Sequence, residues 1–353
     1  ARLSYSEDEV PVGAVVVYQD KIIGVGRNKL ISQNNLTSDE SFLLFNAIMN
    51  GEVNEIDTSA ILISLKIKGE TKDEILGATK IMRSKSLKIE ATENIVDTCG
   101  TGGDMSDTLN ISTAASLVAA SCGVTVAKHG NKSVSSKSGS ADMLENIGYK
   151  FSDDSKVLEQ QLKNNNFCFM FAQYHHSAMK HVINVRKTLG TRTIFNLLGP
   201  LTNPANAKNQ LLGVYDKRWL NTHCEVLNEL GSNKVMVVHG FDGLDEITLS
   251  QNTYICELQN KKIANYNFDP RDIGYEYISL DDIKGGDPKY NAECFMKMIN
   301  GDYNQFQKIV EINAGAAIYL SGKAINIKEG ALIAEKSIAE GRTKEFISRI
   351  TDE

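Results

Sequence analysis

Residues 97–104 read Asp-Thr-Cys-Gly-Thr-Gly-Gly-Asp and lie between a short apolar, strand-like run and a longer helix-like run. The three glycines let backbone amides wrap around an anion. Asn110-Ile111-Ser112-Thr113 then opens an apolar helix predicted to extend through Cys122, so hydroxyl groups and a helix N-terminus face the same place. This pattern predicts a phosphate-binding loop; a tight turn without a ligand is the alternative for the glycines alone.

A second polar loop follows the next predicted strand, Val124 to Ala127. It is basic, rich in hydroxyl groups and interrupted by glycine, and it reads Lys128-His129-Gly130-Asn131-Lys132-Ser133-Val134-Ser135-Ser136-Lys137-Ser138-Gly139-Ser140. Loops at the carboxyl ends of neighbouring parallel strands converge on one crevice. The two loops therefore indicate one polyanionic ligand, and a solvated linker is the alternative for the second loop.

The composition indicates a two-domain cytoplasmic enzyme. The chain of 353 residues is long enough for two domains, and its net charge of -6 gives no bulk attraction to nucleic acid. The six cysteines form no Cys-x-x-Cys pair, which favours a reducing compartment over a zinc site or a disulfide framework. No apolar run reaches the length of a membrane span, and the acidic residues within 1–10 do not fit a signal peptide, so we expect no membrane contact.

Residues 29–93 predict a small helical domain. Thr37-Ser38-Asp39-Glu40 and Thr71-Lys72-Asp73-Glu74 both match the capping box that starts a helix. The first helix is predicted to end at Gly51, and a helix around 59–68 ends at Gly69. We expect helices from about 175–200 to join this domain. Its apolar faces fit either core packing or a subunit interface.

From residue 94 to residue 353, short β-rich runs alternate with helical runs, which predicts an α/β domain with a mostly parallel central sheet. Examples of the predicted strands are Ile95-Val96, Val124 to Ala127, Phe167 to Phe171, Val235 to Val238 and Tyr254 to Leu258. Helices over 303–320 and 329–350 are expected to cover the sheet. The fold class is therefore α/β, with a small N-terminal helical domain and a larger α/β domain.

The adjacent histidines His175 and His176 begin a predicted helix directly after a strand. Paired histidines suggest a metal, but adjacent positions on a helix face different directions and no third ligand has a suitable spacing. Half-buried packing histidines fit the pattern better.

Two further motifs lie in the second half of the chain. Arg186 precedes the Gly190-to-Pro204 stretch, where its planar fork suits a carboxylate, although an ordinary surface arginine has equal support. Asp245 and Glu246 follow the strand that ends at His239-Gly240, in a turn where carboxylates can hold Mg²⁺ against phosphate oxygens. A solvated acidic turn is the alternative for this pair.

Together these motifs closely resemble the anthranilate phosphoribosyltransferases over about residues 29–350. The resemblance implies a fold like that of nucleoside phosphorylases and phosphoribosyltransferases. It also implies transfer of the 5-phosphoribosyl group of phosphoribosyl pyrophosphate (PRPP) to the amine of anthranilate, giving N-(5-phosphoribosyl)anthranilate and pyrophosphate in tryptophan biosynthesis. Two Mg²⁺ ions per subunit and a homodimer formed through the helical domain are implied in the same way.

Carried over position by position, the resemblance assigns three sets of site residues. The PRPP set is Gly100, Gly103, Asp104, Thr108, Asn110, Ile111, Ser112, Thr113, Lys128, His129, Gly130, Asn131, Lys132, Ser133, Val134, Ser135, Ser136 and Ser140. The anthranilate set is Gly100, His129, Asn131, His176, Arg186 and Pro200. The Mg²⁺ set is Ser112, Asp245 and Glu246.

The implied reaction needs positioning and charge neutralisation more than a strong base, because an anilinic amine is neutral at pH 7. We therefore assign no catalytic acid or base. Lys128 and Mg²⁺ are expected to stabilise the departing pyrophosphate, while Arg186 orients the anthranilate carboxylate and Asn131 contacts the ring substituents.

Three positions depart from the family pattern. Ser177 stands where proline commonly follows the paired histidines, and Leu109 stands where an aromatic is common. Lys132 replaces the usual arginine, so a point charge takes the place of a bidentate fork. That change could weaken a phosphate or carboxylate contact without changing the reaction.

Residues 1–28 resemble the opening β-hairpin of a tRNA adenosine deaminase. That enzyme's zinc site needs His-x-Glu and Pro-Cys-x-x-Cys, but the first histidine here is His129 and no proline precedes a cysteine. Deamination is therefore excluded, and we expect a hairpin without an assigned role.

Two rival functions share this architecture. A pyrimidine nucleoside phosphorylase also acts at ribose C1′, but its loops differ from Lys128 to Asn131. A non-enzymatic nucleic-acid-binding relative should carry a basic face, and the acidic balance and the Asp245-Glu246 pair argue against it.

Overall fold

The computed structural model describes residues 13–18, 21–27, 35–91, 94–132, 137–302 and 304–352, with backbone alone in the first two ranges. They form two compact units. The first comprises the described residues up to Ser86 together with His176–Thr202, and the second comprises Leu87–His175 and the described residues from Asn203 onward. The division falls earlier than the predicted boundary at 93, and the segment predicted as a separate stub contributes two strands to the first unit.

The first unit is helical apart from one hairpin, in which β1 (Gly13–Tyr18) pairs antiparallel with β2 (Lys21–Arg27). Both predicted capping boxes are confirmed: Thr37 and Glu40 cap one helix, and Thr71 and Glu74 cap another. The remaining elements are α2 (Ser38–Met49), α3 (Glu55–Lys68), α4 (Lys72–Lys85), η1 (Ser177–His181), α9 (Ile183–Leu189), α10 (Phe195–Leu198) and η2 (Gly199–Leu201).

Two close contacts show how these helices pack against each other. Gly77 of α4 lies so close to α2 that a Cβ at this position would come within 2.2 Å of the Ser38 carbonyl oxygen. Phe45 is fully buried, and its ring meets that of Phe195 edge to face at 5.6 Å between centroids. The segment around residue 195 therefore packs with the N-terminal helices.

The second unit contains a seven-stranded sheet in the order β5-β4-β3-β6-β7-β8-β9. The first five strands in this order are parallel, while β8 and β9 are antiparallel, which confirms the predicted mostly parallel sheet. The strands are β3 (Val96–Gly100), β4 (Val126–Gly130), β5 (Phe167–Phe171), β6 (Asn209–Gly213), β7 (Lys234–Gly240), β8 (Thr253–Gln259) and β9 (Lys262–Phe268).

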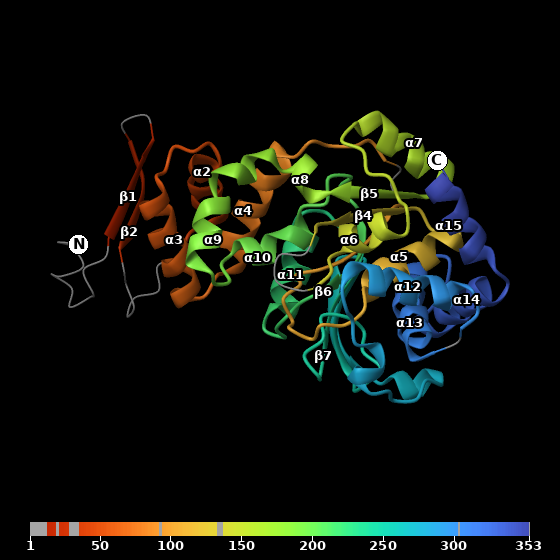
Figure 1. Ribbon diagram of the computed structural model, residues 1–353. Helices are drawn as coiled ribbons and strands as arrows, with labels where there is room; N and C mark the ends of the chain where they lie inside the picture. The colour runs from red at the N-terminus through yellow and green to blue at the C-terminus, as the bar shows by residue number, and fades with distance from the viewer. Residues whose placement is uncertain are drawn as a thin grey trace. The chain divides into compact units, whose positions relative to one another are not determined.

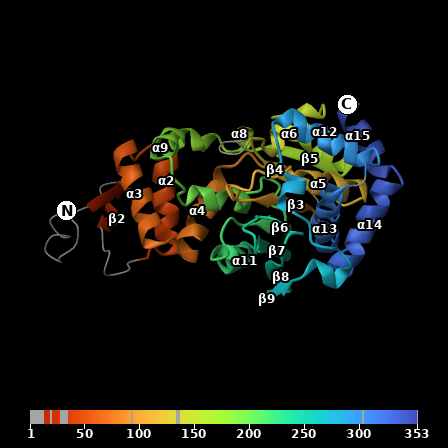
Figure 2. The same cartoon turned by 60° about the horizontal axis from the view of Figure 1, so that its bottom comes forward.

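Helices cover both faces of the sheet (Figures 1 and 2). Side chains alternate between the two faces along each strand, so each strand contributes to a core on either side. Phe167 and Phe169 face one core with α5 (Ile111–Ser121), α13 (Gln305–Leu320) and α14 (Ile327–Ala339). Cys168 and Met170 face the opposite core with α7 (Ser155–Asn165). The other helices of this unit are α6 (Ser140–Asn146), α8 (Ala172–His175), α11 (Trp219–Glu229), α12 (Pro288–Ile299) and α15 (Arg342–Asp352), with short turns η3 (Pro270–Ile273) and η4 (Leu280–Ile283).

The strand order places three loops at one edge of the sheet. The chain runs from β3 outward to β4 and β5, then returns to the other side of β3 with β6 and β7. The carboxyl ends of β3, β6 and β7 thus lie side by side at the point where the order reverses, which is where open α/β sheets bind ligands. Among the described residues, no helix combines the length and apolar character needed to cross a membrane.

Candidate active site

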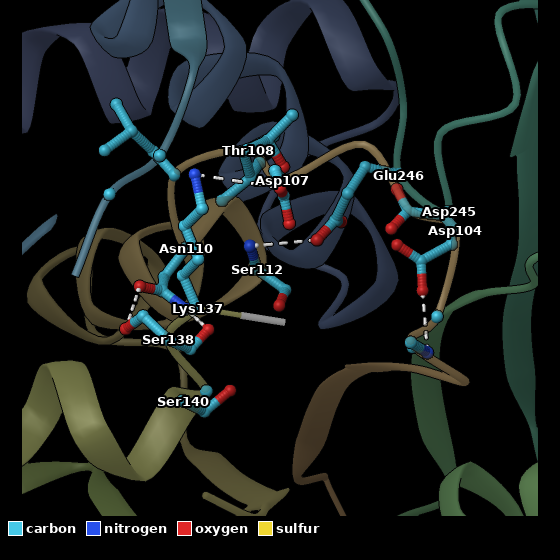
Figure 3. Close-up of a pocket in the computed structure, with 18 residues that line it drawn as sticks. Asp104, Asp107, Thr108, Asn110, Ser112, Lys137, Ser138, Ser140, Asp245 and Glu246 are labelled. Atoms are coloured by element: carbon cyan, nitrogen blue, oxygen red, sulfur yellow. Dashed lines mark hydrogen bonds and ion pairs between the residues drawn. The ribbon is translucent and has the colours of Figure 1, made fainter. Parts of the chain in front are cut away.

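A cavity opens at this edge of the second unit (Figure 3). Ten of the predicted site residues line it: Gly100, Gly103, Asp104, Thr108, Asn110, Ile111, Ser112, Ser140, Asp245 and Glu246. Eight further residues complete the lining: Gly102, Asp107, Leu109, Lys137, Ser138, Gly139, Gly285 and Gly286. The predicted glycine loop, helix start and acidic pair therefore meet in one place.

The acidic pair is held from two sides. Asp245 is fixed by small residues at the ends of neighbouring strands, because a Cβ on Gly213 would lie 1.6 Å from the Asp245 carbonyl oxygen. Behind the pair, fully buried Asn313 of α13 accepts a hydrogen bond from the Ile247 amide at 3.0 Å and donates to the Ile247 carbonyl at 2.9 Å. The backbone N–H and C=O of Ile247, the residue after Glu246, are thus both held by Asn313.

The glycine loop contacts the acidic pair directly. The Gly102 amide donates to Asp245 Oδ2 at 2.9 Å, and a Cβ on Gly100 would lie 2.6 Å from the same oxygen. A side chain at position 100 would therefore displace this carboxylate. Gly102 belongs to the quoted motif but was not among the predicted ligands.

Burial raises the pKa values of both carboxyls. The pKa of Asp245 rises to about 7, through desolvation and then repulsion from Asp104. The pKa of Glu246 rises to about 8, through desolvation and then repulsion from Asp245, while Lys128 and a hydrogen bond from Ser112 act in the opposite direction. The surroundings of the pair therefore disfavour two negative charges, and a bound cation would reduce the repulsion between the two carboxylates.

The N-terminus of α5 faces the acidic pair. The Ser112 amide donates to Glu246 Oε1 at 3.1 Å, so the first turn of the helix already binds one anionic group (Figure 3). On the same helix, the Thr113 hydroxyl donates to Ser140 Oγ at 2.9 Å, which joins the two predicted loops. Asn110 is the helix N-cap residue and contacts Ser138.

The cavity has a third wall, beside the glycine loop with its acidic pair and the N-terminus of α5, and this wall was not predicted from the sequence. The segment Ile283–Gly286 runs antiparallel to residues 107–109, with a hydrogen bond from the Leu109 amide to the Ile283 carbonyl at 2.9 Å. The Gly285 amide donates to the Asp107 carbonyl at 2.7 Å, and a Cβ on Gly285 would lie 2.4 Å from the Thr108 carbonyl oxygen. The Gly-Gly pair before the helix N-cap at Asp287 was the only sequence signal for this wall.

The segment that begins at Lys128, predicted as a loop, is placed differently from the expectation, because Lys128 to Gly130 belong to β4. Lys128 is 1% exposed, lies outside the cavity lining, and donates through Nζ to the Thr98 carbonyl oxygen. Its neighbour Asp97, also fully buried, accepts from the His129 amide at 3.1 Å and from Asn203 Nδ2 at 2.7 Å. Contact of Lys128 with pyrophosphate therefore stays a prediction, and so does its role in the reaction.

Of the residues that the structure describes next to it, His129, Gly130, Asn131 and Lys132 do not line the cavity either, whereas Lys137 to Ser140 do. Gly130 ends β4 against Phe169, Asn131 accepts from Gln173 Nε2 at 3.4 Å, and Lys132 forms an ion pair with Glu145 at 2.8 Å. Thr113 is buried beneath the cavity. The predicted ligands Ser133, Val134, Ser135 and Ser136 lie outside the described residues.

Three predicted anthranilate residues belong to the first unit. Arg186 lies over the Phe195 ring at 5.8 Å from its centroid, and burial lowers the pKa of its guanidinium. His176 and Pro200 are buried. Because His175 is buried as well, the prediction of half-buried histidines is wrong for both His175 and His176. His175, in the second unit, is 1% exposed, and its Nδ1 is hydrogen-bonded to the Leu87 carbonyl at 2.7 Å.

The oxygen ligands at the cavity suit Mg²⁺, which takes part of its coordination from water and substrate, better than a metal ion that needs all its ligands from the protein. In the described part of the chain, no three His, Cys, Asp or Glu side chains are grouped so as to hold a metal ion. Mg²⁺ is usually bound through one or two carboxylates, with the remaining oxygens supplied by water and substrate phosphates. Asp245, Glu246 and the Ser112 hydroxyl, all at the cavity, match that arrangement.

The chain is similar to proteins of known activity along most of its length. Residues 28–86 match the helical bundle domain of the glycosyl transferase family, and residues 92–344 match its a/b domain. The anthranilate phosphoribosyltransferase of Thermoanaerobacter sp. (strain X514) is 44% identical over 325 residues, covering 92% of this chain and 96% of that protein.

Solved structures agree with this similarity. The anthranilate phosphoribosyltransferase of Thermus thermophilus is 36% identical with a TM-score of 0.86, over 90% of this chain and 96% of that one. The Saccharomyces cerevisiae enzyme in complex with PRPP and Mg is 27% identical with a TM-score of 0.82, over 90% and 93% of the two chains. The chain therefore belongs to the glycosyl transferase family and, within it, to the anthranilate phosphoribosyltransferases.

Proposed function

We propose that this chain transfers the 5-phosphoribosyl group of PRPP to the amine of anthranilate, releasing pyrophosphate, as a step of tryptophan biosynthesis. The observation that carries the proposal is the meeting of Asp245 and Glu246 with the N-terminus of α5 and the glycine loop in one cavity. This arrangement offers both donors for phosphate oxygens and carboxylates for a divalent cation. The yeast relative, described in complex with PRPP and Mg, supports the choice of ligand.

Different residues of the cavity are proposed to bind the cation and the phosphate oxygens. Asp245, Glu246 and Ser112 are those that would hold Mg²⁺, whose charge in this chemistry neutralises pyrophosphate oxygens. The first turn of α5 and the amides of the glycine loop bind phosphate oxygens directly. Because the anilinic amine is already neutral, the protein has no proton to remove before attack, and its main contribution is to position the two substrates and stabilise the departing charge.

For anthranilate, we propose Arg186 as the carboxylate ligand, with Asn131 and Gly100 beside the ring and His129, His176 and Pro200 along its path. The proposal is supported by the yeast relative in complex with 4-fluoroanthranilate. Arg186 forms no ion pair with any carboxylate among the described residues, so its guanidinium has no competing partner of that kind. A planar guanidinium can bind a carboxylate through two parallel hydrogen bonds.

We further propose two Mg²⁺ ions per subunit, a cytoplasmic location and a homodimer formed through the helical unit. Exposed apolar side chains on this unit support the last point: Leu43 of α2, Ile56 and Ile67 of α3, and Ile183 of α9 are all at least 40% exposed. Residues 1–28, for which we keep the resemblance to a deaminase hairpin as a hypothesis, are proposed to take no part in the reaction.

The deciding experiment follows the loss of anthranilate fluorescence with PRPP and Mg²⁺, for the full chain and for a chain beginning at residue 29. Both forms should consume anthranilate, and only when PRPP and Mg²⁺ are both present. A parallel reaction with uridine and phosphate tests the nucleoside phosphorylase alternative, and salt-dependent retention on DNA tests the nucleic-acid-binding one. Turnover in the uridine reaction alone, or DNA retention without anthranilate turnover, would overturn the proposal.

A further inference from the structure

A directional chain of hydrogen bonds joins three walls of the cavity through Asn291 of α12. The Gly286 amide donates to Asn291 Oδ1 at 2.8 Å, and Asn291 Nδ2 donates to Asn110 Oδ1 at 2.8 Å. Asn110 Nδ2 in turn donates to the Ser138 carbonyl at 3.1 Å. Asn291 is 2% exposed and does not line the cavity itself.

The two ends of this chain determine the orientation of both side-chain amides. A backbone N–H only donates, so the Gly286 amide requires the oxygen of Asn291 on its side. A backbone carbonyl only accepts, so Ser138 requires the nitrogen of Asn110 on its side. The Ser138 hydroxyl adds a second donor to Asn110 Oδ1 at 3.2 Å. Turning either amide over would set two acceptors or two donors against each other.

This orientation decides what Asn110 can offer to a ligand. Its oxygen is occupied by two donors, whereas its nitrogen carries a second hydrogen besides the one donated to Ser138. Asn110 lies at the cavity beside Ser138 and Lys137 (Figure 3). An N–H donor suits a phosphate oxygen, whereas an exposed amide carbonyl would repel one.

We propose that Asn291 is a positioning residue of the PRPP site, which keeps the Asn110 amide turned with its N–H toward the ligand. The inference rests on the proposed function, because it takes PRPP to be the anion in the cavity. Asn291 acts through Asn110 and ties it to Gly286 of the third wall.

The substitution Asn291→Asp tests this with almost no change of shape. The new carboxylate still accepts from the Gly286 amide but presents a second acceptor to Asn110 Oδ1. If Asn110 turns over in response, its oxygen then faces the Ser138 carbonyl. We expect the KM for PRPP at about pH 8 to rise by about tenfold to a hundredfold, as for loss of a hydrogen bond to a charged group, and the KM for anthranilate to stay within about twofold.

Acid should reverse the effect in this variant. A protonated carboxyl has one acceptor oxygen and one O–H donor, the same pattern as the asparagine amide, and burial raises the pKa of an introduced carboxyl toward neutrality. Its KM for PRPP should therefore fall toward the wild-type value between about pH 8 and about pH 6. Wild-type profiles over the same range account for Asp245 and Glu246, whose pKa values lie at about 7 and about 8. They also account for the partly or fully exposed ionisable groups on the flanking elements, namely Lys137, Asp142, Glu145, Lys284, Asp287 and Glu293.

Asn300→Asp is the matched control, because it makes the same exchange at the exposed C-terminal end of α12. It should leave the KM for PRPP within about twofold at both pH values. Wild-type turnover is measured alongside, and its absence would count against the proposed function rather than against the role of Asn291. With an active wild type, an unchanged KM for PRPP in Asn291→Asp overturns the inference, as does an equal rise for both substrates that acid does not reverse.

If Asn291→Asp does not fold, Asn291→Ala provides a second test. It removes the Asn291 donor to Asn110 Oδ1 and leaves the Ser138 hydroxyl as the remaining donor to that oxygen. The KM for PRPP should rise by about threefold or more, while an unchanged value would contradict the inference.

Discussion

The Asp245 carboxylate accepts a hydrogen bond from the Gly102 amide at 2.9 Å, so the acidic pair and the glycine loop are joined directly. A cation at Asp245 would compete with this contact and leave the amide available to a phosphate oxygen. Replacing Asp245 by Asn together with Glu246 by Gln keeps the shape but removes both charges. We expect Mg²⁺-dependent turnover to fall by about a hundredfold or more, measured across a Mg²⁺ titration.

Calorimetric titration of Mg²⁺ in the presence of PRPP gives the same test without turnover. After subtraction of the heat of Mg²⁺ binding to free PRPP, the double variant should show no further heat under conditions where the wild type does. Asp216 and Glu229, partly exposed and outside the cavity lining, supply a control with the same two exchanges. Equal activity of the wild type and the Asp245/Glu246 variant at every Mg²⁺ concentration would remove these carboxylates from the site.

A substitution at Gly213 tests, by steric means alone, whether the position of the turn that carries Asp245 and Glu246 matters. An added methyl group would lie 1.6 Å from the Asp245 carbonyl oxygen, so Gly213→Ala must move the backbone that carries the acidic pair. A displacement of about 1 Å at a reacting centre can cost about a hundredfold in rate, and we expect a loss of that order in kcat/KM. Gly199→Ala, where the added methyl group meets nothing within 4 Å, should stay near wild type. Equal activity of both variants would show that the loop position is not critical.

The contiguous motifs that meet in the cavity could be found in the sequence because each is set by local chemistry. The glycine loop, the start of α5 and the acidic turn each follow directly from a strand end, so their positions follow once the strands are assigned. Two strands of the sheet, β6 and β9, were not among the runs named from the sequence, for identifiable reasons. β6 carries the polar residues Asn209 and Gln210, which are buried through hydrogen bonds to Asn94 and Cys99. β9 is a largely exposed edge strand without an apolar pattern.

What sequence could not predict depends on contacts between distant segments. The third wall pairs residues 283–286 with 107–109, and no local pattern indicates that pairing. β4 was expected to end at Ala127 but runs to Gly130, because Lys128 and His129 are buried against Thr98 and Asp97. Polar residues that find partners inside the fold do not look like strand residues beforehand.

Arg186 is predicted to govern affinity for one substrate only. Arg186→Ala should raise the KM for anthranilate by about tenfold or more, because a hydrogen-bonded ion pair is lost, and leave the KM for PRPP within about twofold. Exposed Lys187→Ala, next in sequence, is the control for a general loss of positive charge. Steady-state kinetics with each substrate varied in turn checks this, and an equal rise for both substrates would contradict the assigned role.

Glu311 predicts a pH dependence of stability away from the site. Burial raises its pKa from 4.5 to about 6, against hydrogen bonds from Gln307 and Tyr275 that favour the charged form. A carboxyl with a raised folded-state pKa binds its proton more tightly in the folded protein. Its stabilising contribution is therefore complete below about pH 4.5 and is lost as the pH rises through about 6, amounting to about 2 kcal/mol.

Glu311→Gln should remove this dependence. Urea unfolding at several pH values should show the wild type losing stability relative to the variant between about pH 4.5 and about pH 6.5. Glu293→Gln, at an exposed position on α12, controls for the exchange itself. A difference between wild type and Glu311→Gln that does not change with pH would show that Glu311 titrates normally.

Lys137 is the only cationic side chain among the cavity-lining residues that the structure describes, and its ammonium lies 3.8 Å from Asp107. Both partners are more than a third exposed, so this ion pair is weak and can be exchanged for a phosphate oxygen. Lys137→Ala should raise the KM for PRPP by about threefold to fivefold and weaken its dependence on salt. Lys284→Ala removes a similarly exposed lysine that does not line the cavity, and it should change neither quantity. Equal effects of the two substitutions would mean that overall charge, rather than a contact in the cavity, attracts the substrate.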